Sequence, residues 1–78
     1  MTTVSETEIY RGFEIKPYAR VVPGGYIAVA TIARLSLPSE ELHVEPPATV
    51  FRTADAALFA ASSWCHYMVD EMVKRLAH

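Results

Sequence analysis

Cys65 and His66 are of the residue types that serve as a nucleophile and its general base, and they stand next to each other. The surrounding pattern predicts a helix, however, and successive residues of a helix point about 100° apart. The thiol and the imidazole would therefore not face each other. Cys65 also falls within an apolar stripe, where a cysteine behaves as a small hydrophobic residue. We interpret Cys65 as a core residue and predict no catalytic residue.

The residues that could bind a metal are His43, Glu45, His66 and His78. His43 and Glu45 share one face of an extended segment, whereas His66 lies on a helix flank and His78 is the last residue. Their spacing matches neither the paired CxxC nor the HExxH pattern of zinc proteins. We interpret the histidines as surface residues, and we predict no metal and no cofactor.

Acidic and glycine residues also lack a catalytic or phosphate-binding arrangement. Asp70 and Glu71 are adjacent on the predicted helix and diverge, so they are no carboxylate pair for acid–base chemistry. Asp70 and Lys74, four residues apart, predict an ion pair along the helix surface. Gly24 and Gly25 belong to a predicted hairpin turn rather than to a phosphate-binding loop.

Large apolar side chains carry the clearest sign of a binding surface. Phe59 and Tyr67 project away from the main helix stripe, and Trp64 lies at its margin. Exposed aromatic residues are enriched at protein interfaces. The alternatives are that these rings drape over the sheet edges, or that an open sheet face stacks nucleic-acid bases. We predict a candidate interface formed by Tyr18, Tyr26, Ile32, Phe59, Trp64 and Tyr67.

The main element that positions these residues is a predicted helix over residues 53–76. Thr53 is a suitable N-cap, and Asp55 complements the positive end of the helix. Lys74 and Arg75 complement its negative end. The apolar stripe at 3.6-residue spacing consists of Leu58, Ala61, Cys65, Met68, Val69, Met72, Val73 and Leu76.

Three extended segments precede the helix. Residues 9–21 alternate between apolar and polar types, which predicts a half-buried strand. Gly12 suggests a bulge in it, and Pro17 places it at an edge or bends it. The turn Pro23-Gly24-Gly25 then leads into a second strand over residues 26–35, which is apolar on both faces.

The third segment is less regular. Residues 36–41 are predicted to form a loop, and residues 42–52 a strand that Pro46-Pro47 interrupts. Its firmest part is residues 49–52. The chain is therefore predicted to be α+β, with a three-stranded antiparallel meander packed against one long C-terminal helix in two layers. Residues 1–7 form a flexible tail, and residues 8–78 form one domain.

Size and composition predict that the protein associates with another chain. A chain of 78 residues buries only about 60% of its unfolded surface, yet 51% of its residues are apolar. One face of residues 26–35 takes the helix, and the other face lacks a cover within the chain. We predict a homodimer or another protein as the partner.

Charge and cysteine content exclude several other classes of protein. The net charge is −2 and no basic run is present, which argues against nucleic acid as a partner. One cysteine allows no disulfide within the chain, and no stretch is long enough to span a membrane. The first residues do not form a secretory signal. These features predict a cytoplasmic protein.

Two resemblances add to this picture. The stretches YRGFEIKP (residues 10–17), GGYIA (24–28) and FRTADAAL (51–58) resemble those of short proteobacterial proteins of unknown function. That resemblance implies the same strand-strand-strand-helix order and no activity. Residues 24–26 and 53–58 are also similar to HicB-type antitoxins, although residues 36–41 replace that family's Pro-Asp-x-x-Gly segment.

The sequence thus favours a small non-enzymatic protein-interaction module that self-associates through its sheet or helix flank. One alternative is an antitoxin-type or other small regulatory protein that binds a toxin or nucleic acid. A third is a small enzyme that uses His43, His66 or Cys65.

Overall fold

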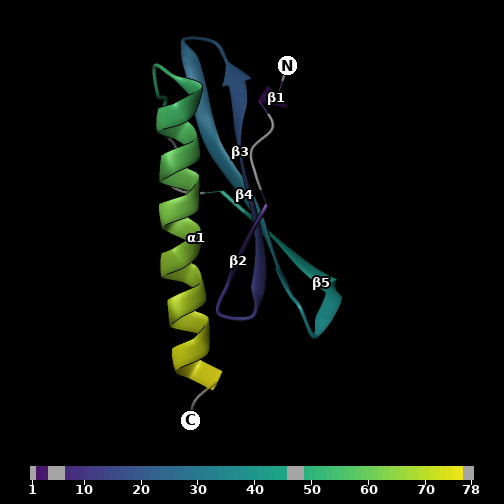
Figure 1. The fold of residues 1–78 in the computed structure, drawn as a ribbon. Helices are drawn as coiled ribbons and strands as arrows, with labels where there is room; N and C mark the ends of the chain where they lie inside the picture. Colours follow the sequence, from purple (N-terminus) through teal and green to yellow (C-terminus); the bar gives the residue numbers. More distant parts are fainter. Residues whose placement is uncertain (1, 4–6, 46–48, 77–78) are drawn as a thin grey trace.

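A computed structural model describes residues 2–3, 7–45 and 49–76, with the side chains of residues 2–3 and 37–40 excepted. It is an α+β structure in two layers, with an antiparallel sheet and one long helix that runs lengthwise across one face of the sheet (Figure 1). The elements are β1 (Thr2–Thr3), β2 (Glu8–Tyr10), β3 (Phe13–Val22), β4 (Gly25–Arg34), β5 (Leu37–Val44) and α1 (Ala54–Leu76). The predicted fold class is confirmed, with more strands than the three expected.

The first predicted strand is in fact a hairpin. Tyr10 pairs with Phe13 across a two-residue turn formed by Arg11 and Gly12. Both turn residues have positive φ, at +50° for Arg11 and +87° for Gly12, as a type I′ turn requires. The prediction of a bulge at Gly12 is therefore wrong. The two-residue turn shifts the alternation by one residue: Glu8 and Tyr10 of β2 share the helix side of the sheet with Phe13 and Ile15 of β3, and Ile9 is exposed on the other side.

The sheet holds five strands in four positions, in the order β1-β3-β4-β5, with β2 also paired to β3. β1 pairs with Ala19 and Arg20 of β3, whereas β2 pairs with residues 13–15. Thr2 and Thr3, predicted to lie in a tail, thus form a strand. Pro17 sits in β3 between these two stretches, and its ring nitrogen, which carries no N–H, is turned to the side of β3 away from β4.

The connection after β4 differs from the prediction. β5 begins at Leu37 directly after a tight turn at Leu35-Ser36, so residues 37–41 are strand and not loop. Residues 49–52, the firmest part of the predicted third strand, contribute only one bridge, between Phe51 and Tyr26. The predicted interruption at Pro46-Pro47 falls outside the described residues. Two hairpins, β3–β4 and β4–β5, therefore build most of the sheet.

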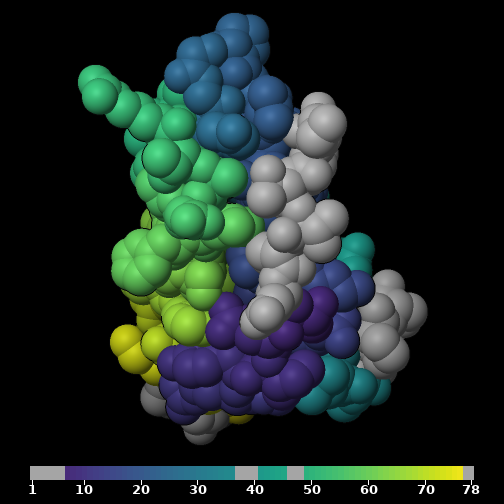
Figure 2. All heavy atoms as spheres, turned by 45° about the horizontal axis from the view of Figure 1, so that its top comes forward, coloured from purple at the N-terminus to yellow at the C-terminus, as the bar shows by residue number. Residues whose placement is uncertain are grey.

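Helix α1 follows the prediction closely. Thr53 Oγ1 accepts a hydrogen bond from the Ala56 N–H at 3.1 Å, which confirms the N-cap. The stripe turned to the sheet buries Ala57, Ala61, Cys65 and Val69 fully, and Met68, Met72 and Val73 pack beside them. α1 lies on β3 and β4. Figure 2 shows the β2–β3 hairpin against the C-terminal half of α1.

The core lies between α1 and the even-numbered residues of β4. Ala28, Ala30 and Ile32 face the helix together with Phe13 and Ile15 of β3. Ile32 is only 2% exposed, so the prediction that it belongs to an exposed interface is wrong. The small alanines of β4 allow the helix to approach closely.

The opposite face of the sheet is covered by the chain's own side chains. Val29 is fully buried there, although no helix or second sheet of the described residues lies over that face. Its cross-strand neighbour is Tyr18, and an ion pair between Arg20 and Glu45, 3.8 Å apart, joins β3 to the end of β5 across β4. The burial of Val29 within a single chain therefore gives no support to the prediction that this face needs a partner to cover it.

Candidate binding surfaces on the two flanks of helix α1

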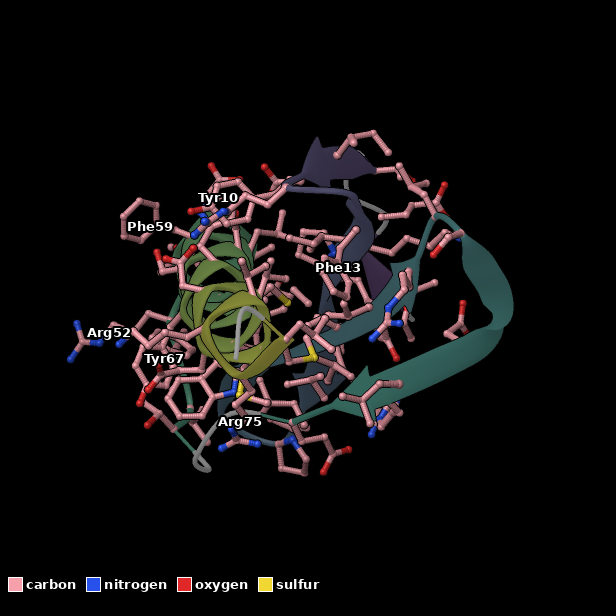
Figure 3. The ribbon with its side chains drawn as sticks, turned by 90° about the horizontal axis from the view of Figure 1, so that it is seen from below. Tyr10, Phe13, Arg52, Phe59, Tyr67 and Arg75 are labelled. Atoms are coloured by element: carbon pink, nitrogen blue, oxygen red, sulfur yellow. The ribbon has the colours of Figure 1, made fainter. Side chains whose placement is uncertain are left out.

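The polar and aromatic residues of α1 gather on two opposite flanks. We call the side with Ser62, His66 and Asp70 the hairpin flank, because it contacts β2 and the β2–β3 turn. We call the side with Trp64 and Tyr67, together with Phe51 from the preceding segment, the aromatic flank. Figure 3 shows that Phe59 projects on the side of Tyr10, away from Tyr67.

On the hairpin flank, one oxygen of Asp70 binds two residues of the β2–β3 turn. Tyr10 Oη and Arg11 Nη1 each donate to Asp70 Oδ1 at 2.8 Å. The Arg11 guanidinium, with help from the Tyr10 hydroxyl, holds the pKa of Asp70 below its ordinary value. The predicted pair of Asp70 with Lys74 is wrong, since Lys74 bonds Glu71 at 3.2 Å instead.

One turn away, Glu8 of β2 binds two residues of the helix. Ser62 Oγ donates to Glu8 Oε1 at 2.6 Å, and His66 Nε2 lies 3.2 Å from Glu8 Oε2. The Tyr10 ring packs on the His66 ring with centroids 4.3 Å apart. The hairpin flank is thus a continuous set of polar contacts that fastens the β2–β3 hairpin to α1.

This set does not form a nucleophile–base pair. Ser62 and His66 both bond Glu8, and the hydrogen bonds of the described residues do not join Ser62 to His66. Catalysis by a serine needs its hydroxyl on the base itself. Hydrogen bonding to Asp70 also raises the pKa of the Tyr10 hydroxyl, so Tyr10 stays protonated as a donor. The arrangement holds a hairpin in place.

Cys65 lies in the core, as predicted. Its side chain is fully buried, and burial together with the charge of Glu8 raises the pKa of its thiol to about 11. A thiol with such a pKa supplies almost no thiolate at neutral pH and is a poor nucleophile.

The described residues of metal-binding type, His43, Glu45 and His66, do not come together. His43 Nε2 lies 3.4 Å from Glu45 Oε1 on the face of the sheet turned away from α1. His66 lies on the hairpin flank at the other side of the sheet, and His78 is outside the described residues. Among the residues that the structure describes, no group of three potential ligands is close enough to hold an ion.

On the aromatic flank, the surface is hollowed between the helix and the segment before it. The open hollow has a volume of about 340 Å³ and is lined by Ala28, Thr49, Phe51, Ala60, Ser63, Trp64 and Tyr67. Backbone hydrogen bonds of Phe51 with Tyr26, at 2.7 and 2.9 Å, fix one wall. Trp64 and Tyr67, with ring centroids 5.6 Å apart, form the other. The hollow fits an apolar side chain.

The predicted interface residues separate into distinct groups. Trp64 and Tyr67 line the hollow, and Tyr67 is 55% exposed. Phe59 is 76% exposed but lies toward the hairpin flank. Tyr18 is half-buried on the opposite sheet face, and Tyr26 is half-buried at the bridge to Phe51. The six residues therefore do not form one surface.

The roles of several residues on both flanks were not predicted from the sequence. Phe51 was assigned to a predicted strand over residues 49–52, and that pattern did not direct it to the hollow. Ser62, His66 and Asp70 stand at four-residue spacing and share a helix face, which could have revealed the hairpin flank. Glu8 gave no local signal, because its contacts lie 54 and 58 residues away.

Comparison with known proteins adds no relative: no family model, no curated protein and no solved structure matches the chain. The two resemblances stated from the sequence therefore stay predictions.

Among the described residues, no helix is both long and apolar enough to cross a membrane.

Proposed function

We propose that this chain is a non-enzymatic protein-interaction module that binds an apolar side chain of a partner protein in the hollow of the aromatic flank. The observation that carries the proposal is the hollow itself, with Trp64 and the exposed Tyr67 on one wall and Phe51 on the other. Aromatic residues around an apolar depression are characteristic of the centres of protein interfaces.

The rest of the molecule supports a binding role over a catalytic one. The polar residues that could react are engaged in structural contacts, Ser62 and His66 with Glu8 and Asp70 with the hairpin turn. Cys65 is buried and its thiol pKa is raised to about 11. The aromatic flank, by contrast, leaves large apolar side chains in contact with solvent.

A matched pair of variants tests this proposal. Tyr67→Glu places a charge at the hollow, and Phe59→Glu places the same charge at another exposed aromatic position away from it. Both residues lie on the surface, so we expect both variants to fold. The unchanged protein and both variants are immobilised and used to capture partners from cells that express the chain, with quantification by mass spectrometry.

We expect one partner to be enriched on the unchanged protein and on Phe59→Glu, and to be lost on Tyr67→Glu. Melting curves of the three proteins exclude unfolding as the cause. A partner retained equally by all three would show that the hollow is not the binding surface. Loss on Phe59→Glu alone would place binding at the hairpin flank instead.

A further inference from the structure

The outer edge of β5 is a second candidate surface, separate from the hollow. β5 ends the sheet order, and within the described part of the chain its one neighbouring strand is β4. An unpaired edge presents a row of backbone donors and acceptors that another strand can bind. α1 lies on β3 and β4, so it leaves this edge open.

The hydrogen bonds of β4 show which groups of β5 point outward. Tyr26 exchanges two backbone hydrogen bonds with Phe51 on the side of β4 away from β3. Even-numbered residues of β4 therefore direct their backbone toward β5, and Ile32 exchanges hydrogen bonds with Leu42. The backbone groups of Glu41 and His43, which alternate with Leu42, consequently face the open edge.

The side chains along this edge are arranged in a simple pattern. Leu42 lies on the helix side of the sheet and is 45% exposed. Glu41 and His43 lie on the opposite side and are exposed. Glu41 makes no ion pair with any described residue, whereas His43 already lies near Glu45.

We propose that β5 pairs antiparallel with β5 of a second copy of this chain, about a two-fold axis at Leu42. This register sets Glu41 opposite His43 of the second copy, twice, with each pair exchanging backbone hydrogen bonds. The two Leu42 side chains meet on the helix side. A register centred on Glu41 would instead set the two Glu41 carboxylates opposite each other, and one centred on His43 would set Glu41 opposite Glu45. Both would place like charges together, which destabilises a sheet.

The register is tested by single cysteines at Glu41, Leu42 and His43. In the proposed dimer the two Leu42 Cα atoms lie about 4.5 Å apart, within the range of a disulfide. Cysteines at position 41, or at position 43, would be offset by two residues along the strands and lie about 8 Å apart, too far to bond. The unchanged protein, whose Cys65 is buried, is the control.

We expect Leu42→Cys to form a disulfide dimer under mild oxidation, and Glu41→Cys and His43→Cys to remain mostly unlinked. Sedimentation of the unchanged protein should show a dimer, and Glu41→Lys should raise its dissociation constant roughly tenfold. Preferential linking at position 41 or 43, or a monomer at all concentrations, would overturn the proposal. A dimer that links at none of the three positions would also overturn it. None of these results depends on the hollow, so capture through Tyr67 is tested separately.

Discussion

Asp70 holds the β2–β3 turn against α1 with a single carboxylate oxygen. The two bonds it accepts come from Tyr10 and Arg11, which are consecutive residues, so the turn is fixed both in position and in orientation. Arg11 adopts a positive φ of +50°, which costs a non-glycine residue some strain. Its ion pair with Asp70 helps to offset that cost.

Replacement of Asp70 by asparagine should remove part of the acid sensitivity of folding. The pKa of Asp70 in the folded chain lies below its ordinary value of 3.8, so the carboxylate stabilises the folded state above about pH 4. That contribution is lost as the pH falls through the folded pKa, because the unfolded chain takes up the proton first. Asp70→Asn should therefore be less stable at neutral pH and differ less from the unchanged protein in acid.

Urea unfolding from pH 7 down to acid pH measures this difference. Glu71→Gln is a suitable control, because the described ion pair of Glu71 is with the exposed Lys74 on the same helix and does not involve the β2–β3 turn. A constant stability difference between Asp70→Asn and the unchanged protein across the pH range would contradict the assigned ion pair.

Gly25 permits a close approach between β4 and the wall of the hollow. A Cβ atom at Gly25 would lie 2.2 Å from the carbonyl oxygen of Phe51, and Gly25 has a φ of +153°. Gly25→Ala should therefore destabilise the fold by about 2 kcal/mol or more, because backbone atoms have to move. Gly24→Ala meets open space and should cost about 1 kcal/mol from its positive φ alone. Equal losses in denaturant unfolding would contradict this account of Gly25.

At the residue scale, the sequence predicted what depends on near neighbours. The Thr53 cap, the charges at the helix ends and the burial of Cys65 all follow from local position in a helix. The predicted partner of Asp70 was wrong: a spacing of four residues indicated Lys74, whereas the residue that Asp70 binds, Arg11, is 59 residues away. A contact of that separation depends on where the β2–β3 hairpin turns.

At the scale of elements, the largest error concerned the hairpin at Arg11-Gly12. Ile9, Phe13 and Ile15 all occupy odd positions, so residues 9–21 looked like one strand with a bulge, although the turn places Ile9 on the face opposite to Phe13 and Ile15. The position of β5 was missed because Pro38 and two glutamates lowered the strand signal of residues 37–41. The long helix α1 was much less ambiguous in the sequence, because it has an apolar stripe and no internal glycine or proline.

The orientation of β4 gives a direct test at this scale. The sequence left both faces equally apolar, whereas the structure turns Ile32 to the helix and Ile27 to the other face. Ile32→Ala should cost about 2–5 kcal/mol, as truncation of a buried isoleucine does. Ile27→Ala, at a half-buried position, should cost distinctly less. Denaturant unfolding that ranked the two in the reverse order would contradict the assigned face.

At the scale of the whole molecule, the two flanks of α1 differ in what they leave free. The hairpin flank is closed by polar contacts from Glu8, Tyr10 and Arg11. Within the described residues, the aromatic flank faces the short segment around Phe51 and Ala28 of β4, with an open hollow between them. Composition predicted surplus apolar surface, yet it could not locate that surface, because the position of Phe51 depends on how the chain crosses from β5 to α1.

Trp64 is the only tryptophan of the chain, and it lines the hollow. Its fluorescence therefore reports directly on whether a partner fills that site. Titration of the captured partner into the unchanged protein should shift the Trp64 emission to shorter wavelength as water leaves the indole, and Tyr67→Glu should abolish the shift. A partner without tryptophan, or one with its tryptophans replaced, keeps the signal unambiguous. Saturating binding with no change in the Trp64 emission would contradict the assignment of the hollow as the binding surface.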